Sequence, residues 1–354
     1  MSALRRGKGR GMSALRCGKA RGMSASGVEK RAVSDNRIEM SLAGALLSGD
    51  VRALARAISL AEDRDPQASQ LVAEVQPNTG NAYLVGLTGA PGTGKSTLAD
   101  ALVKVIRDRQ QTVGVIAVDP SSPFTGGAVL GDRIRMSRHT LDKGVFIRSM
   151  GARGHLGGLA AATREAIHLL DAYGRDVILV ETVGVGQSEL EISTICDTVV
   201  LVLMPESGDA VQSIKAGILE IADVFVINKS DLGGAEKTRR LIQDAIGLGP
   251  KQAWRPPIVL ASAAKEEGIE QVWQAVRSHQ AYLTESGTLA TRRQQRLKHE
   301  VMALVADRAR EEARRVLEGD TAVGRRLREN RNGKLNPYAL AEEVLDQRPP
   351  QGGS

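Results

Sequence analysis

The sequence of 354 residues predicts an α/β fold in which a mainly parallel sheet is flanked by helices. Short apolar runs alternate with helical stretches, which is typical of parallel strands joined by right-handed helical crossovers. Hydrophobic residues make up 42% of the chain but aromatic residues only 3%, so the core must consist of Ala, Val, Ile and Leu, as in helices packed on a buried parallel sheet. The seven predicted strands are Tyr83–Leu87, Val113–Val118, Val145–Ile147, Val177–Val180, Val199–Met204, Val224–Ile227 and Ile258–Leu260.

The basic charge of the chain belongs to its N-terminal end. Residues 1–37 contain the near-repeats MSALRRGKGRG and MSALRCGKARG and carry ten Lys and Arg against two Asp and Glu, a net charge of +8 that leaves −1 for residues 38–354. This composition predicts a disordered basic tail. The tail is either a targeting or RNA-binding arm or, as we favour, a solvated extension upstream of later start codons at Met12, Met23 or Met40, so nucleic acid is not an expected partner.

Helical patterns flank the predicted sheet on both sides. Apolar residues at helical spacing follow Asp50, which can act as an N-cap. Near the other end Leu297, Val301, Leu304 and Val305 form an apolar stripe among charged residues, which packs either on its own domain or on a second copy of the chain. The predicted regions are the basic tail (1–37), an N-terminal helical segment (38–80), the α/β domain (81–286), a C-terminal helical region (287–346) and a flexible tail (347–354).

Cysteine usage and hydropathy predict a cytoplasmic protein. Cys17 and Cys196 are too few and too far apart for a disulfide framework or a Cys-rich metal site. No segment approaches the roughly 18 consecutive apolar residues that a membrane helix needs, and the N-terminus lacks the apolar stretch of a secretory signal. We therefore expect no membrane association.

A phosphate-binding motif stands between the first predicted strand and the helix after it. Residues Gly89–Ser96 fit the pattern G-x-x-x-x-G-K-[ST] in the strand-to-helix context that this motif requires. The glycines let backbone N–H groups turn toward phosphate oxygens, and the helix N-terminus adds partial positive charge. Lys95 would bridge the terminal phosphates and Ser96 would bind Mg²⁺. The predicted phosphate-binding residues are Gly89, Ala90, Pro91, Gly92, Thr93, Gly94, Lys95, Ser96 and Thr97.

Three carboxylates are placed to hold this Mg²⁺ ion, which takes one or two carboxylates and keeps several waters. Asp119 and Glu181 each end a predicted strand, and ligands of open α/β sheets collect beyond the carboxyl ends of the strands. Asp132 follows the segment 120–131. Each acid alone could instead cap a helix or be solvated. In the glycine-rich run after Glu181, Gln187 either orients the attacking water or is an exposed loop residue.

A second motif predicts the base. Asn228, Lys229 and Asp231 lie in an N-K-x-D sequence directly after a predicted strand. A carboxylate only accepts hydrogen bonds, so Asp231 would pair with the N1–H and exocyclic amine of guanine and repel the unprotonated N1 of adenine. Asn228 would support the loop, and Lys229 would cover the base with its alkyl chain. Further on, backbone N–H groups in the run from Ser262 to Ala264, with Ser262 and Ala263 as the named candidates, would face the guanine O6.

These residues resemble the MeaB/ArgK family of P-loop GTPases, bacterial relatives of the human methylmalonic aciduria protein MMAA. The resemblance runs from about residue 38 to about residue 345, and one departure is Ile134 in place of the commoner Thr, with Arg135 and Met136 retained. The stretches that carry it are Gly89–Ser96, Val118–Ser122, Thr125–Gly127, Gly131–Arg133, Arg153–Gly158, Glu181–Glu189, Asp209–Lys215 and Asn228–Asp231.

The resemblance implies a GTPase chaperone that associates with adenosylcobalamin-dependent acyl-CoA mutases, typically methylmalonyl-CoA mutase, and that gates cofactor loading and protects the mutase. It also implies a homodimer joined through C-terminal helices. In this sequence Asp209 and Lys215 match the family's additional switch, which transmits nucleotide state to the mutase. The catalytic set would be Lys95, Asp119, Glu181 and Gln187, and the metal set would be Ser96, Asp119, Asp132 and Glu181.

Other functions remain open on the sequence alone. An ArgK-type kinase or ATPase of amino-acid (LAO/AO) transport would need a base for an acceptor hydroxyl, which no residue suggests. A metal-insertion GTPase is poorly supported because five scattered histidines and two isolated cysteines lack ligand spacing. If the chain were a non-enzymatic binding module, the three carboxylates predicted to hold Mg²⁺ would have no role. We expect slow hydrolysis, about 10⁻⁴ to 10⁻² s⁻¹, because no residue can be assigned as an arginine finger from the sequence. Arg135 and Arg153 are candidates for supplying positive charge in cis.

Overall fold

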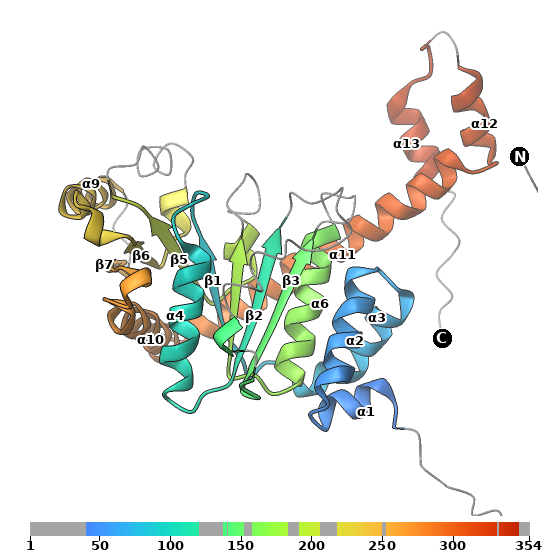
Figure 1. The fold of residues 1–354 in the computed structure, drawn as a ribbon. Coiled ribbons are helices and arrows are strands. Elements are labelled where there is room, and N and C mark those ends of the chain that lie inside the picture. Colours follow the sequence, from blue (N-terminus) through green and yellow to red (C-terminus); the bar gives the residue numbers. More distant parts are fainter. Residues whose placement is uncertain are drawn as a thin grey trace, which may run out of the picture. The chain divides into compact units, whose positions relative to one another are not determined.

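A computed structural model describes residues 40–119, 137–139, 141–151, 158–182, 191–205, 218–249, 253–330 and 333–346. In this part of the chain seven strands form one sheet in the order β3-β2-β4-β1-β5-β6-β7 (Figure 1). Each pair of neighbouring strands is parallel, which confirms the predicted fold class. The strands are β1 (Tyr83–Thr88), β2 (Val113–Asp119), β3 (Val145–Gly151), β4 (Val177–Thr182), β5 (Thr198–Leu203), β6 (Val224–Ile227) and β7 (Ile258–Leu260).

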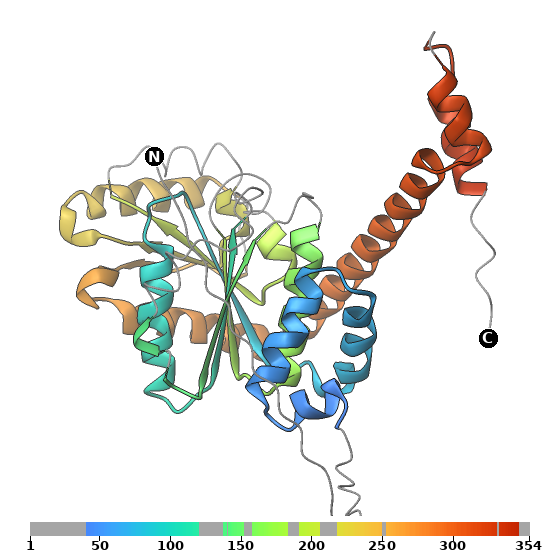
Figure 2. The ribbon, with the colours of Figure 1, turned by 45° about the vertical axis from the view of Figure 1, so that its right-hand side comes forward.

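Alternate strand residues face two helical layers. Leu84 and Leu201 lie on the face covered by α6 and α9, whereas Val85 and Val200 lie on the face covered by α4 and α10. Figure 2 shows the sheet nearly edge-on between these layers. Every residue of β1, β4 and β5 is buried, which explains why these strands are continuous apolar runs. The helices are α4 (Lys95–Arg107), α6 (Gly158–Ala172), α9 (Ala235–Leu248) and α10 (Ile269–Glu285).

Three N-terminal helices extend the layer that contains α6. The predicted N-cap is confirmed, since the Asp50 side chain accepts a hydrogen bond from the N–H of Arg52 at 2.7 Å. Leu54 and Ile58 of α2 are fully buried in the same core as α6. These helices are α1 (Leu42–Leu47), α2 (Val51–Glu62) and α3 (Pro66–Val75), and short 3₁₀ turns are η1 (Gln76–Asn78), η2 (Ser137–His139), η3 (Ile192–Thr194), η4 (Ile218–Ile221), η5 (Ser230–Leu232) and η6 (Ala263–Lys265).

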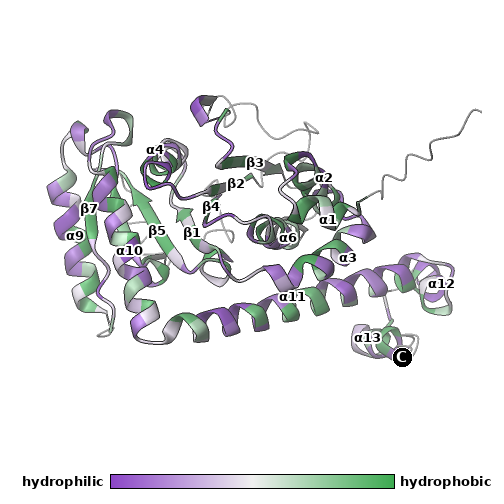
Figure 3. Ribbon diagram, turned by 90° about the horizontal axis from the view of Figure 1, so that it is seen from below, coloured by the Kyte–Doolittle hydropathy of each residue, from purple (hydrophilic) through white to green (hydrophobic). Residues whose placement is uncertain are grey.

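The C-terminal region is helical, as predicted. Helix α11 (Thr288–Glu318) is 31 residues long and is followed by α12 (Ala322–Glu329) and α13 (Pro337–Asp346). The end of α11 and the two short helices share a small apolar cluster of their own. In Figure 3 apolar and polar segments alternate along α11. No helix among the described residues is long and apolar enough to span a membrane.

Candidate nucleotide-binding site

The predicted phosphate loop connects β1 to α4, in the centre of the sheet. Three of its residues, Gly89, Gly92 and Gly94, have positive φ angles of 136°, 82° and 90°. A Cβ atom at Gly89 would lie 2.1 Å from the carbonyl oxygen of Val202, and one at Gly94 would lie 2.4 Å from Nδ2 of Asn228. Glycine is therefore required at both positions by conformation and by close packing against neighbouring elements.

Lys95 is the first residue of α4 and is almost completely buried, with 5% of its surface exposed. Its ammonium group donates to the carbonyl oxygens of Gly89 at 2.7 Å and Ala90 at 3.0 Å, so it lies across the mouth of the loop. The helix starts without a side-chain cap at Gly94, which leaves the dipole of its first turn directed at the loop. An oxyanion is the natural ligand of such an arrangement.

Two predicted metal ligands lie together beside this loop. The hydroxyl of Ser96 donates to Oε1 of Glu181 at 2.7 Å, and Glu181 is buried at the end of β4. The strand register pairs Leu87 of β1 with Glu181, which brings the carboxylate next to the phosphate loop. Hydroxyl and carboxylate oxygens are suitable ligands for Mg²⁺. No cluster of three metal-binding His, Cys, Asp or Glu side chains occurs among the residues described.

The remaining acids are only partly described. Asp119 is the last residue of β2, the strand next to β4, so its backbone lies at the same edge of the sheet as Glu181. Six other residues with predicted roles lie outside the described part of the chain. They are Asp132, Arg135, Arg153, Gln187, Asp209 and Lys215.

Asn228 connects the base motif to the phosphate loop. It follows β6 and is 2% exposed. Its Nδ2 donates to the carbonyl of Thr93 at 2.8 Å, and its Oδ1 accepts from the backbone N–H of Ala263 at 2.9 Å. Lys229 has a left-handed conformation, φ 57°, and donates to the carbonyl of Gly92 at 2.8 Å. The two motifs, more than 130 residues apart in sequence, therefore form one continuous site.

The geometry around Asp231 fits a base-selecting carboxylate. Its Oδ1 accepts from the hydroxyl of Ser262 at 2.7 Å, and its Oδ2 lies 3.3 Å from Nζ of Lys265. The Ser262 hydrogen bond, supported by Lys265, lowers the pKa of Asp231 from its ordinary value. The group therefore stays ionised at neutral pH and can only accept hydrogen bonds from a ligand.

The loop from Ser262 to Glu267 contains the predicted run Ser262 to Ala264 and adds Lys265, which the motif did not indicate. Both predicted donors to the guanine O6 are already used within the fold, since the N–H of Ser262 donates to the carbonyl of Glu267 and the N–H of Ala263 donates to Asn228, both at 2.9 Å. The N–H of Ala264 has no partner among the described hydrogen bonds. Lys265 could not be identified from the sequence because no spacing rule links it to Asp231.

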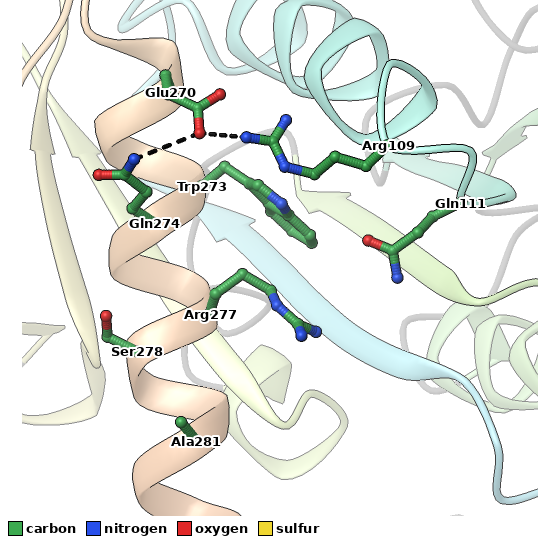
Figure 4. A pocket seen from close by; sticks show the side chains of 8 residues that line it. All are labelled: Arg109, Gln111, Glu270, Trp273, Gln274, Arg277, Ser278 and Ala281. Atoms are coloured by element: carbon green, nitrogen blue, oxygen red, sulfur yellow. Dashed lines mark hydrogen bonds and ion pairs between the residues drawn. The ribbon is translucent and has the colours of Figure 1, made fainter.

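A separate cavity of about 650 Å³ lies between the end of α4 and α10 (Figure 4). In it Arg109 forms an ion pair with Glu270, to which Gln274 also donates at 3.4 Å, and the indole of Trp273 lies between Arg109 and Arg277. The residues that line the cavity include none of the predicted site residues.

Comparison with known proteins agrees with this geometry. Residues 54–317 match the model of the family described as methylmalonyl Co-A mutase-associated GTPase MeaB. A protein of Pyrococcus horikoshii named as a GTPase is 48% identical over 307 residues, which are 85% of this chain and 96% of the relative. The mitochondrial methylmalonic aciduria type A homolog of Mus musculus is 41% identical over 217 residues, 60% of this chain and 52% of that protein.

Among solved structures, the crystal structure of a LAO/AO transport system kinase matches with a TM-score of 0.64 and 30% sequence identity. The match covers 86% of this chain and 95% of that one. The architecture, the phosphate loop and the base motif all agree with the family match. The chain therefore belongs to the MeaB family of methylmalonyl Co-A mutase-associated GTPases and is itself a GTPase.

Proposed function

We propose that this GTPase binds GTP with Mg²⁺ at the carboxyl edge of its sheet and hydrolyses it slowly to regulate a partner enzyme. The observation that carries the choice of nucleotide is the ionised Asp231, held by Ser262 and Lys265 beside the loop that ends at Glu267. A carboxylate in this position accepts from guanine and repels adenine. A site that accepts a hydrogen bond from a donor group of the base can discriminate by about 10⁴-fold against a base without that donor group.

The residues around the phosphates take separate roles in this proposal. Lys95 donates to the terminal phosphate oxygens, moving from the loop carbonyls that it contacts at 2.7 and 3.0 Å. Ser96 and Glu181, with Asp119 and Asp132, hold Mg²⁺, which neutralises phosphate charge when bound. Gln187 orients the attacking water. The absence of an assigned arginine finger is the reason that we expect slow hydrolysis.

The partner that we propose is an adenosylcobalamin-dependent acyl-CoA mutase of the methylmalonyl-CoA type. The chain would gate loading of the cobalamin cofactor and protect the mutase, with Asp209 and Lys215 transmitting the nucleotide state. The support is the description of the family and the name of the mouse relative. The fold supplies the parallel sheet of the GTPase core that this role needs.

The proposed role is tested by measuring GTP turnover with and without the mutase, in the presence and absence of cobalamin. We expect a nucleotide-dependent complex and turnover at least about tenfold faster with the mutase, as is typical when a partner completes a GTPase site. The proposal would be contradicted by turnover of tens per second by the chain alone. It would also be contradicted by a complex with the mutase whose affinity does not depend on the bound nucleotide.

We also propose that the chain forms a homodimer through α11. Leu297, Val301, Leu304 and Val305 on this helix are each about half exposed, at 49 to 58%. An apolar stripe of this kind on a long helix is suited to packing against a second copy. Val301→Lys together with Val305→Lys should convert a dimer to a monomer in sedimentation measurements, whereas Arg308→Lys should leave the dimer unchanged.

The structural match to a LAO/AO transport system kinase suggests a second candidate, phosphorylation of a protein acceptor. Terminally labelled GTP or ATP distinguishes the two functions. Label transferred to an amino-acid-binding protein would support the kinase, whereas label released only as inorganic phosphate would support the GTPase chaperone.

A further inference from the structure

Glu266 has an unusual conformation in the loop beside the base motif. It has a φ angle of 57°, a left-handed conformation that a residue with a side chain rarely adopts. The loop is closed on either side of it by two backbone hydrogen bonds between Ser262 and Glu267, at 2.9 and 3.1 Å. Strained conformations of this kind persist where surrounding contacts hold them.

Two cations hold the carboxylate of Glu266. Nζ of Lys104, on α4, lies 2.5 Å from Oε2, and the guanidinium of Arg138, in η2, donates to Oε1 at 2.7 Å. Arg138 also contacts Asp100 of α4 at 2.5 Å. The two cations lower the pKa of Glu266 to about 2, so it is ionised throughout the physiological range. The loop is thus attached to the same helix that begins with Lys95 and Ser96.

The conformation of this loop determines the positions of the Ser262 hydroxyl, the Lys265 ammonium and the backbone N–H groups of Ala263 and Ala264. The Ser262 hydroxyl and the Lys265 ammonium both contact Asp231, and the Ala263 N–H is fixed by Asn228. The next N–H, that of Ala264, is not hydrogen-bonded within the described residues. The left-handed Glu266 ends this turn, and its own N–H donates to the carbonyl of Ala263 at 3.3 Å.

We propose that Glu266 is a positioning residue for guanine recognition. Clamped by Lys104 and Arg138, it keeps the loop in the conformation that presents the N–H of Ala264 to the guanine O6. The inference rests on the proposed binding of guanine nucleotides at Asp231. It concerns a residue that the nucleotide-binding motifs do not include, and it assigns a role to the contact between η2 and the base loop.

The test compares binding of GDP with binding of 6-thioguanosine diphosphate by calorimetry in the full-length protein. The thio analogue keeps the N1–H and the exocyclic amine but replaces O6 with sulfur, which is a weak acceptor. Glu266→Ala should weaken GDP binding about fivefold and binding of the analogue less than about twofold, because the contact that Glu266 positions is already weak in the analogue.

Three further variants make the result specific. Glu266→Gly relieves the left-handed strain but removes the clamp, so it should lose affinity as Glu266→Ala does. Arg138→Gln leaves the loop sequence unchanged and should give a smaller loss of the same selectivity. Glu343→Gln breaks an ion pair with Arg326 of similar exposure, 40% against 39% for Glu266, and should change neither affinity.

The outcomes separate this inference from the function on which it rests. If the wild-type protein binds both nucleotides equally, the base contact itself is overturned, and the positioning role falls with it. If the wild-type protein prefers GDP but folded Glu266→Ala and Arg138→Gln keep the full preference, the positioning role alone is overturned. Equal weakening of both nucleotides would also overturn it, because a general loss of loop structure does not discriminate at O6.

Discussion

Charged side chains have different partners at the two ends of the strands, which we call the carboxyl edge, where the parallel strands end, and the amino edge, where they begin. At the carboxyl edge Lys95 and Asp231 lie beside loops of glycine and backbone donors, where we propose that the nucleotide binds. At the amino edge two buried acids, Asp197 before β5 and Asp223 before β6, are matched by side chains of the protein itself. Asp231 also pairs with Lys265, but it is exposed, so we expect it to act on a ligand. The buried Asp197 and Asp223 act within the fold.

The amino edge anchors the C-terminal helix. Asp197, 1% exposed, accepts from the N–H of Leu84 at 3.1 Å and from Arg293 and Arg296, both at 3.0 Å. Further along the same edge, Asp223 accepts from Arg292 of α11 and from the N–H of Val199 in β5, both at 2.9 Å. Substitutions at this edge should therefore change stability and leave nucleotide binding intact, and substitutions at the carboxyl edge should do the reverse.

The largest effect is expected at the base-selecting carboxylate. Asp231→Asn replaces an acceptor with a donor at the position that faces C2 of the base, so the preference for GTP over xanthosine triphosphate should shift by roughly 10⁴-fold. Competition binding with the two nucleotides measures the shift. Unchanged GTP affinity would mean that Asp231 does not contact the base.

Next in size is the loss of a buried acid at the opposite edge. Asp197→Ala removes the buried carboxylate that accepts from the Leu84 N–H and from two arginines and should lower the free energy of unfolding by about 3 kcal/mol, measured by urea denaturation. Asp307→Ala breaks an exposed pair with Arg310 on α11 and should cost less than about 0.5 kcal/mol. GTP affinity of folded Asp197→Ala far below wild type would refute the separation of the two edges.

Lys95→Met should weaken GTP binding roughly 100-fold, about 2.7 kcal/mol, because charged hydrogen bonds to the phosphates are lost. The melting temperature should change little, since methionine fills similar space. Lys237→Met, at an exposed site on α9, is the matched control. A large fall in melting temperature with retained binding would assign Lys95 to structure and not to the ligand.

The smallest effect concerns pH and again the amino edge. Burial lowers the pKa of His279 to about 4, against the opposing effect of Asp223 and with a smaller contribution from Arg292. The unfolded chain titrates near pH 6.5, so between these values it binds more protons than the folded protein, and stability falls as pH is lowered. We expect a loss of ~2 kcal/mol between pH 7 and pH 5 that His279→Gln removes, and equal pH slopes for the two proteins would show that the histidine is not responsible.

Much of the carboxyl edge was predictable because its residues are constrained by backbone conformation and secondary structure within a few positions of the chain. A glycine with positive φ, a lysine at the start of a helix and an acid at the end of a strand each leave a pattern within a few residues. The predicted strands agree with the structure to within a few residues for a similar reason, since burial on both faces requires continuous apolar runs.

The amino edge and the clamp on Glu266 could not be predicted in this way. Arg293 and Asp197 are 96 residues apart, and Arg138 and Glu266 are 128 apart. Each looks like an ordinary solvated charge in the sequence, and no period or motif selects one partner among 48 basic and 41 acidic residues.

Sequence alone thus determined the order of elements and the phosphate loop and predicted the chemistry of base selection, because backbone sterics and hydrogen-bond polarity act over short stretches of chain. Only the tertiary structure decided that Asn228 joins the two motifs, that the N–H of Ala264 has no partner among the described hydrogen bonds and that arginines of α11 neutralise buried acids. These pairings depend on which strands become neighbours, and that is settled when the whole sheet packs against its helices.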